Sequence, residues 1–440
     1  MADDGFTPDW DALTEEATEL LSAYIRVDTV NPPGNETRAC DFYGAILASE
    51  GIPYRVYEPA DAPGRGTLVA TLPGDGTGGK QLILLNHTDV VPFEREHWTV
   101  DPLGGEVSEG YIWGRGTLDM KGMGIMELIT FLLHHRHGLP LRRDLTFIAV
   151  ADEEAGSVYG AEFLAREHPE LLDCVCVLNE GGRGSTRAFG VERPLMQIGV
   201  AEKIPFWVRL RTQGRPGHGS VPTPDNAADR LVRALQRIQD WERPAQIGPE
   251  LQAYFDGLHA SGLFEDEPTP EVIERVAARQ PRVEALLRNT ISLTTLESGV
   301  KHNVIPAGAS ATLDCRLLPG ADPDAFLAGM VEVIDDDEVE VEVVLRSYGP
   351  PSPIDSELYE TLSRAVRNTV EDAVVVPWTS TGFTDSRVFR RMGYPAYGFV
   401  PIFVPPSDQA LGHGNDERIA IEGLRMGMQI LHDTVRSICG

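Results

Sequence analysis

The chain has 440 residues, of which 42% are hydrophobic, so it is long enough for two or three domains with a large core. Its formal net charge is −29, because 67 acidic residues outnumber 38 lysines and arginines. A surface this acidic argues against nucleic acid and anionic membranes as partners. Five scattered cysteines, no basic leader and no apolar run near the ~20 residues that span a bilayer predict a cytoplasmic protein.

Helical and extended patterns alternate along the first part of the chain. The expected helices are 9–26, 39–50, 122–137 and one near 157–168, and the expected strands are 53–58, 67–72, 81–86, 144–151 and 174–179. This alternation is typical of an α/β fold with a doubly wound, mostly parallel sheet. We expect His134, His135 and His137 on an exposed last helical turn. Cys174 and Cys176 lie two apart in one strand and are expected on the same face.

The pattern changes near residue 200, where apolar and polar residues begin to alternate. Expected helices at 225–240 and 323–334 are interleaved with strands at 291–297, 309–317 and 338–346, and 245–290 holds several charged, helix-like segments. Residues 202–347 are therefore predicted to form a small α+β domain. This domain interrupts an α/β domain made of 1–201 and 348–440.

Acids and histidines follow several of the apolar runs. His87 and Asp89 follow the strand at 81–86, Glu153 and Glu154 follow 144–151, Glu180 follows 174–179, and Asp119 and His413 lie in glycine-rich turns. In open α/β sheets, ligands bind at the carboxyl ends of the strands. We therefore expect these side chains to converge, and a buried cluster of acids needs a bound cation.

The ligand types favour a catalytic metal centre. Three histidine or carboxylate ligands and a water suit one catalytic zinc ion, whereas a bridging carboxylate suits two metal ions about 3.5–4 Å apart. Asp119, flanked by glycines, could bridge two ions, and Asp89 could accept a hydrogen bond from His87. Of Glu153 and Glu154, one could bind metal while the other takes a proton from the metal-bound water.

At these residues the chain resembles a family of dinuclear-zinc metallopeptidases. The family includes aminoacylase, glutamate carboxypeptidase, acetylornithine deacetylase and succinyl-diaminopimelate desuccinylase. The resemblance covers essentially the whole length and rests on NPPG from Asn31, HTDVVP from His87, GRGTLDMKG from Gly114, ADEEAGS from Ala151, NEGG from Asn179, GHGSVP from Gly217, NVIP from Asn303, DCRLLPG from Asp314 and STGFTDSR from Ser380.

The resemblance implies a role for each candidate in the cluster. His87 and Glu180 would hold one zinc ion, Glu154 and His413 would hold the other, and Asp119 would bridge them next to a cis peptide bond to Met120. Glu153 would be the general base, and Asp89 would orient His87. Cobalt or manganese could substitute for the two zinc ions. The inserted domain would be the family's lid and dimerisation domain.

The resemblance also implies substrate-binding residues on or near this lid. His218 would stabilise the oxyanion, often in the site of a partner subunit, and Asn303 would assist it. Arg316 would bind the substrate carboxylate in a pocket lined by Gly382. From the residues alone, His218 could simply be a histidine of a Gly/Pro turn, and Arg316 could form an internal ion pair.

These expectations describe a metal-dependent hydrolase, and the resemblance implies a homodimer formed through the lid domain. It would cleave an amide or peptide bond of a small substrate with a free carboxylate, such as an N-acyl amino acid, a dipeptide or a peptide C-terminus. A metal-bridging water would attack with Glu153 as the base. Two alternatives remain: a cocatalytic aminopeptidase, for which Arg316 would be dispensable, and a non-catalytic module that binds calcium.

Overall fold

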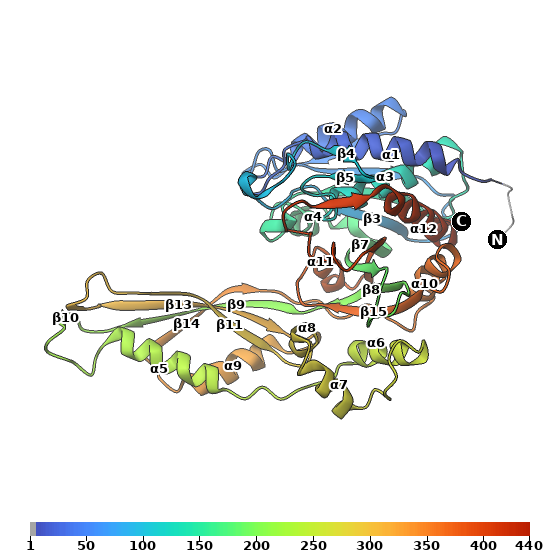
Figure 1. The fold of residues 1–440 in the computed structure, drawn as a ribbon. Helices are drawn as coiled ribbons and strands as arrows, with labels where there is room; N and C mark the ends of the chain where they lie inside the picture. Colours follow the sequence, from blue (N-terminus) through green and yellow to red (C-terminus); the bar gives the residue numbers. More distant parts are fainter. Residues whose placement is uncertain (1–5) are drawn as a thin grey trace.

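The computed structural model describes residues 6–440. Figure 1 shows a rounded body, built on a large sheet, from which a long arm extends to the left. The eight strands of the body sheet run in the order β1 (Tyr54–Tyr57), β2 (Thr67–Leu72), β6 (Leu145–Val150), β3 (Gln81–His87), β7 (Cys174–Ser185), β16 (Ala396–Val404), β8 (Leu195–Glu202) and β15 (Val374–Ser380).

Most neighbours in this sheet are parallel. β6, β3, β7 and β16 form a parallel core, β8 and β15 pair in parallel, and antiparallel contacts occur at β1–β2–β6 and where β16 meets β8. The predicted mostly parallel α/β fold is confirmed. The four core strands therefore point their carboxyl ends toward one edge, as the sequence pattern requires.

Helices cover both faces of the body sheet. One face packs against α1 (Trp10–Ile25), α2 (Thr37–Ser49), α3 (Lys121–Arg136), α10 (Glu357–Thr369) and α12 (Ile421–Cys439), and the other against α4 (Ala161–Glu167) and α11 (Ser386–Arg391). The α3 helix is buried on nearly every side, between the sheet and α1 and α12, which explains why most of its residues are apolar. No helix within residues 6–440 is both long and apolar enough to cross a bilayer.

Two local expectations in the body are wrong. His134 is only 2% exposed, because α12 covers it and the ring of His432 packs 5.4 Å from its own; only His135 and His137 are exposed. Cys174 and Cys176 lie on opposite faces of the sheet, because a register shift between β3 and β7 interrupts the alternation.

The body contains a second, small sheet that the sequence analysis did not predict. It consists of β4 (Glu106–Ser108), β5 (Tyr111–Trp113) and β17 (Arg418–Ala420), in the order β17-β5-β4. Strands of three residues are too short to show a period of two. This sheet joins the loop before Asp119 to the segment that follows His413.

The arm contains a four-stranded antiparallel sheet, in the order β11 (Thr290–Ser298), β13 (Gly308–Leu317), β9 (Ile204–Gln213) and β14 (Val339–Arg346). Its core is formed with α5 (Ala227–Asp240) and α9 (Pro323–Ile334). The helices and strands expected here are confirmed. Two very short strands, β10 (Gly217–His218) and β12 (Val304–Ile305), pair with each other, and Figure 1 shows β10 at the far end of the arm.

The charged region between the arm helix α5 and strand β11 folds as α6 (Pro249–Ala260), α7 (Pro270–Ala277) and α8 (Pro281–Ala285). We call 249–285 the helical segment. It packs against β8 and β15 of the body sheet rather than against the arm sheet, in an apolar cluster that includes Phe255, Leu258 and Val376. The helical segment therefore covers one face of the body sheet at its β15 end, where Val374 and Val376 point toward it.

Candidate metal centre and active site

The five predicted metal ligands come from five separate parts of the body. His87 ends β3, Asp119 precedes α3, and Glu154 lies in a short 3-10 turn (Glu153–Ala155) after β6. Glu180 lies within β7, and His413 lies in the loop between β16 and β17. The structure brings all five together at the carboxyl edge of the parallel strands.

Asp119 lies between the two histidines. Its Oδ1 is 3.0 Å from Nε2 of His87, and its Oδ2 is 3.0 Å from Nε2 of His413. The remaining carboxylates complete two groups: Glu180 Oε1 lies 3.5 Å from His87 Nε2, and Glu154 Oε1 lies 3.2 Å from His413 Nε2. The peptide bond from Asp119 to Met120 is cis, as expected. Each histidine therefore faces one oxygen of Asp119 and one glutamate.

This donor set suits bound cations. Ligand atoms of His87, Asp119 and Glu154 lie within 4.8 Å of one another, as do those of His87, Glu153 and Glu180. Imidazole nitrogens and carboxylate oxygens in such a mixed set suit zinc and similar transition metals better than calcium, which prefers oxygen alone. A shared carboxylate with one oxygen toward each group fits a pair of ions.

The electrostatics of the cluster favour bound positive charge. Burial raises the pKa of Glu153 well above its usual range, and the charge of Glu180 raises it further. Burial likewise raises the pKa of Glu180, with Asp119 adding to the effect. Hydrogen bonds to Asp119 and Glu154 raise the pKa of His413 to about 10. These directions agree with a cluster that favours additional positive charge.

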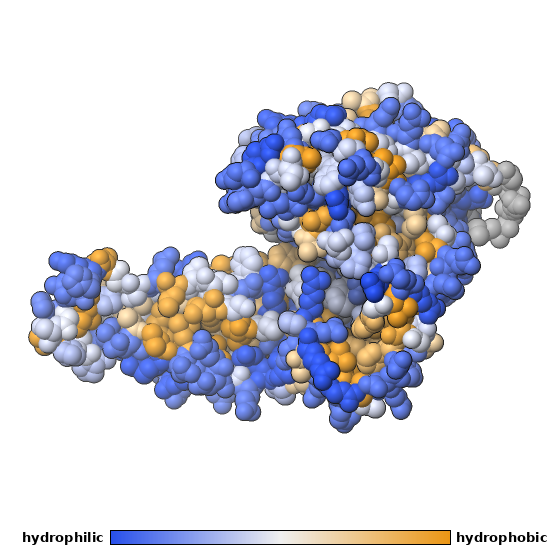
Figure 2. Space-filling view, in the orientation of Figure 1, coloured by the Kyte–Doolittle hydropathy of each residue, from blue (hydrophilic) through white to orange (hydrophobic). Residues whose placement is uncertain are grey.

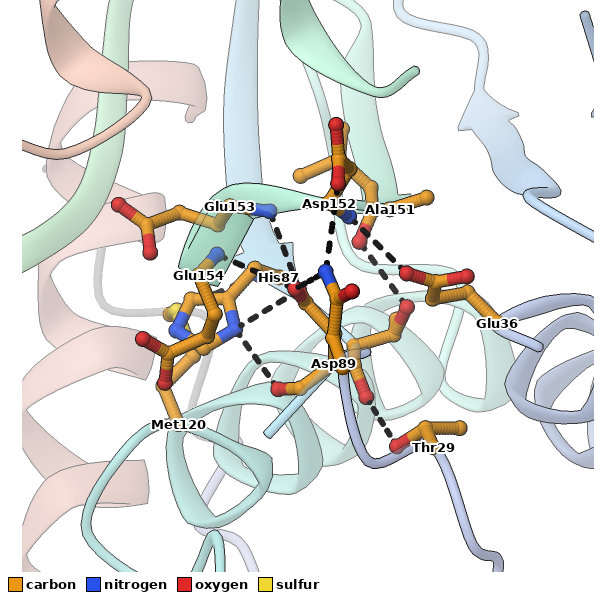
Figure 3. A network of polar contacts seen from close by, with 12 residues as sticks. Thr29, Glu36, His87, Asp89, Met120, Ala151, Asp152, Glu153 and Glu154 are labelled. Atoms are coloured by element: carbon orange, nitrogen blue, oxygen red, sulfur yellow. Dashed lines mark hydrogen bonds and ion pairs between the residues drawn. The ribbon is translucent and has the colours of Figure 1, made fainter. Parts of the chain in front are cut away.

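Asp89 has a broader role than sequence predicted. Nδ1 of His87 lies 3.0 Å from the main-chain oxygen of Asp89 and 3.5 Å from its Oδ1, so the carbonyl is the nearer acceptor. That bond leaves Nε2 free to face Asp119. The Asp89 carboxylate accepts hydrogen bonds from the main-chain N–H groups of Glu153 and Glu154, both at 3.1 Å. Figure 3 shows Asp89 between His87 and the 3-10 turn, so it orients both.

A supporting layer of hydrogen-bonded residues around Asp89, which the sequence analysis did not predict, consists of Asn31, Asp152, Arg65 and Glu36. Asn31 Nδ2 donates to Asp89 Oδ2 at 2.8 Å and to Asp152 Oδ1 at 3.2 Å. Arg65 binds both Glu36 and Asp152 with 2.7 Å contacts. Asp152 has a left-handed backbone, with φ of 69°, and its main-chain N–H donates to Glu36. The NPPG motif at Asn31 was the available signal, but its partners lie 58 and 121 residues away.

Glu417 supports the loop that carries Asp119. It is fully buried and accepts hydrogen bonds from the Arg115 guanidinium and from the main-chain N–H groups of Gly116, Leu118 and Asp119. One carboxylate thus fixes the approach to the bridging residue. The sequence offered no signal for this role, because Glu417 is one of two adjacent acidic residues, Asp416 and Glu417, that look alike in the sequence.

Close backbone packing positions Glu180. A side chain at Gly182 would place its Cβ 2.3 Å from the main-chain oxygen of Gly398 and 2.4 Å from that of Gln197. Only glycine therefore allows β7 to lie so close to its neighbouring strands at this point. The NEGG motif serves this packing as well as supplying the acid.

The predicted substrate-binding residues lie in two places. Arg316, on β13, binds Asp314 at 2.7 Å and stacks 5.1 Å from the ring of Phe383, which directly follows Gly382. Arg316 Nη1 is buried and has no hydrogen-bond partner within residues 6–440. His218 is exposed at the end of the arm, next to Asn303, whose main-chain oxygen accepts from Gly219. The structure thus brings Arg316 to Gly382, whereas His218 and Asn303 lie together far along the arm (Figure 1).

Comparison with known proteins identifies the family. The sequence model of peptidase family M20/M25/M40 matches residues 83–437, most of the chain. The chain belongs to this family. Family membership confirms the resemblance of the motifs and makes the chain a hydrolase of the metallopeptidase and aminoacylase type.

Relatives and solved structures agree with membership of family M20/M25/M40. The chain is 32% identical to an N-fatty-acyl-amino acid synthase/hydrolase of Xenopus tropicalis over 79% of this chain and 70% of that protein. It is 31% identical to human aminoacylase-1 over 91% of this chain and 90% of that protein. The crystal structure of an M20 family metallo-carboxypeptidase from Sulfolobus solfataricus has the same fold, with a TM-score of 0.75 at 18% identity, covering 96% and 99% of the two chains.

Proposed function

We propose that the chain is a dinuclear zinc hydrolase that cleaves the amide or peptide bond of a small substrate with a free carboxylate. The observation that carries this proposal is the position of Asp119, with one oxygen 3.0 Å from each of two histidines. His87 and Glu180 would hold one ion, and His413 and Glu154 the other. Cobalt or manganese would satisfy the same donors.

Glu153 is the proposed general base. Two zinc ions bound here would polarise the substrate carbonyl and lower the pKa of the attacking water. Glu153 would accept the proton of that water and then deliver it to the leaving amine. Two features support this role: Glu153 is 8% exposed, and its main-chain N–H is held by Asp89, which also holds that of Glu154.

Arg316 is the proposed reader of the substrate carboxylate. Its Nη1 is free of protein acceptors within residues 6–440, and a guanidinium binds a carboxylate through two parallel hydrogen bonds. Phe383 and Asp314 hold the other parts of the guanidinium. Gly382 would leave room beside it. Substrates of this kind are N-acyl amino acids, dipeptides and peptide C-termini.

Residues 202–347 are proposed to act as the lid of a catalytic domain formed by 1–201 and 348–440. His218 would stabilise the oxyanion and Asn303 would assist it, in the site of a second subunit of a homodimer. Their position at the end of the arm supports this arrangement, because it separates them from the cluster of their own chain (Figure 1). The packing of the helical segment against β15 supports a lid that is attached to the body sheet at this strand.

The deciding experiment is Glu153→Ala. We expect the variant to keep its metal content while turnover of N-acyl amino acids and dipeptides falls by several orders of magnitude, since general base catalysis and proton delivery are both lost. The exposed Glu170→Ala is the matched control. Turnover retained by Glu153→Ala would contradict the assignment, and calcium as the only bound metal would favour a non-catalytic module. Comparing N-blocked with C-blocked dipeptides separates carboxylate recognition from an aminopeptidase, for which Arg316 would be dispensable.

A further inference from the structure

The STGFTDSR motif contributes more than Gly382 to the surroundings of the cluster. Arg387, near the start of α11, is only 6% exposed, and its guanidinium binds the loop that follows the 3-10 turn (Glu153–Ala155). Its Nη2 donates to the main-chain oxygen of Gly156 at 2.8 Å, and its Nη1 donates to Oγ of Ser157 at 3.2 Å. A buried cation of this motif therefore binds the chain just after the proposed general base.

The turn of Glu153 is held at both of its ends. At its start, the Asp89 carboxylate accepts the main-chain N–H groups of Glu153 and of the next residue. At its end, Gly156 donates to the main-chain oxygen of Glu153 at 3.0 Å, and its own oxygen accepts from Arg387. Gly156 and Ser157 have left-handed backbones, with φ of 112° and 67°. A serine keeps this conformation only where surrounding contacts hold it, so Arg387 fixes the path of the chain as it leaves the turn.

The acids near Arg387 do not explain its position. Nη2 of Arg387 lies 3.8 Å from Oε1 of Glu162, but Arg391 holds both oxygens of that carboxylate at 3.0 and 2.6 Å. Asp385 is buried beside the same loop, where burial raises its pKa to about 6 and the charge of Arg387 opposes that rise. The shortest contact of Arg387 is with the Gly156 carbonyl rather than with an acid, so its main effect is on the geometry of the loop.

The ring of Phe383 contacts two guanidiniums. Cζ of Arg387 lies 4.9 Å from the centre of this ring, and Cζ of Arg316 lies 5.1 Å from the same centre. Arg387 belongs to α11 of the body, whereas Arg316 belongs to β13 of the arm. The face of an aromatic ring attracts a guanidinium. One ring therefore helps to position both the proposed reader of the substrate carboxylate and the arginine that supports the turn of Glu153.

Phe383 lies where the body meets the arm. Only Lys203 separates β8 of the body sheet from β9 of the arm sheet. Figure 2 shows the outer part of the arm projecting clear of the body, so residues at the root of the arm carry the contact between them. The contacts of Phe383 join Arg316 to the body at this root. Phe383 and Arg387 line a small cavity there with residues from both chain crossings: Lys203, Pro205, Ser347 and Gly349.

We propose that Arg387 is a positioning residue for Glu153, and that Phe383 joins this support to Arg316. The inference rests on the proposed function, in which Glu153 is the base and Arg316 binds the substrate carboxylate. Arg387 acts through the turn rather than on the reacting atoms: it fixes the Gly156 carbonyl and with it the direction of the Glu153 side chain. A misplacement of about 1 Å at a reacting group lowers a rate by about 100-fold.

The test places one substitution in two backgrounds. At equal metal content, Arg387→Gln should lower kcat by roughly 10- to 100-fold and leave KM within about threefold of wild type. In Glu153→Ala, the same substitution should cause no further loss, because a support for Glu153 has no carboxylate left to position. An equal fold-loss in both backgrounds would overturn the inference, since Arg387 would then act independently of Glu153.

Arg391→Gln is the matched control, because Arg391 is an exposed arginine of the same helix that binds Glu162 instead of the turn. It should leave kcat unchanged in both backgrounds. Arg387→Lys covers the case in which the glutamine variant fails to fold. Lysine keeps the charge and a donor for Gly156 but lacks the planar fork that binds two acceptors, so its loss of kcat should be smaller. That loss should again be absent from Glu153→Ala.

Phe383→Leu tests the link to the arm. It removes the aromatic face beneath both guanidiniums, so KM for substrates with a free carboxylate should rise and kcat should fall, each by about 3- to 30-fold. Wild-type KM and kcat in Phe383→Leu would overturn this link. Wild-type kcat in Arg387→Gln and Arg387→Lys would overturn the positioning role and leave the proposed function intact. Turnover retained by Glu153→Ala alone would remove the proposed function and this inference with it.

Discussion

The metal cluster and the end of the arm hold their functional side chains in opposite ways. In the cluster, His87 is 1% exposed and Asp89 is completely buried, and hydrogen bonds from Asn31, Glu153 and Glu154 fix the Asp89 carboxylate. At the end of the arm, His218 is exposed, and among the described residues its ring forms hydrogen bonds only with Ser220 of its own turn. Metal ligands need a fixed geometry and therefore a supporting layer, whereas a group that meets the substrate can lie on a separate element.

This contrast predicts that substitutions in the two regions change different measured properties of the protein. Substitutions in the cluster should change metal content together with turnover. Substitutions at the end of the arm should change turnover alone, because β10 lies at the far end of the arm from the body that holds the cluster (Figure 1).

The largest effect is expected from Asp119→Ala. Loss of the shared carboxylate removes one contact from each histidine group, so metal content should fall and turnover should drop by roughly 10³-fold or more. Metal analysis and kcat/KM measure the two effects, with the exposed Asp61→Ala as control. Full metal content with turnover within tenfold of wild type would show that Asp119 does not bridge.

His218→Ala should reduce turnover by about 10²-fold, the loss found when one oxyanion donor is removed. Metal content and the midpoint of thermal unfolding should stay at wild-type values, because the ring is exposed at the far end of the arm and hydrogen-bonds to Ser220 of its own turn. Mixing His218→Ala with Glu153→Ala subunits should restore part of the activity if His218 serves a partner subunit. No recovery in a mixture shown to contain hybrid dimers would place its action elsewhere.

Asn31→Ala tests the supporting layer itself. Removing the amide leaves Asp89 and Asp152 without a shared donor, so metal affinity or kcat/KM should fall by roughly 10- to 100-fold. Asn35→Gly is a suitable control, since Asn35 is an exposed residue directly after that motif, with φ of 79°, which glycine adopts readily. Unchanged metal affinity and kcat/KM in Asn31→Ala would mean that Asp89 is oriented without it.

The smallest effect concerns the junction between body and arm. Lys203 is 1% exposed and donates to the main-chain oxygens of Ala285 and Arg288, and burial lowers its pKa to about 7. Between that value and about 10.5 the unfolded chain binds more protons than the folded chain, so raising the pH stabilises the fold. The free energy of unfolding of wild type relative to Lys203→Met should therefore increase by about 1 kcal/mol per pH unit from pH 7 to 10.

Chemical denaturation at several pH values measures this difference. Lys301→Met, which alters an exposed lysine of the arm, should show no such slope relative to wild type. A flat difference between wild type and Lys203→Met would mean that Lys203 carries the same charge in both states.

The sequence by itself determined the body fold and the composition of the metal cluster. Apolar runs of strand length end at His87, Glu153 and Glu180, and parallel strands deliver their carboxyl ends to one edge, so local pattern was enough to predict convergence. The arm sheet was predictable for a similar reason, because its strands alternate between buried and exposed residues.

Only the tertiary structure decided which groups support and surround the cluster. Asn31 and Asp89 are 58 residues apart, Arg115 and Glu417 are 302 apart, and Arg282 of the helical segment lines the same cavity as Arg183 of β7. Charge pairing and cavity walls depend on three-dimensional proximity, which has no period along the chain. An acid such as Glu417 and its exposed neighbour Asp416 are therefore alike in sequence, and burial alone gives them different roles.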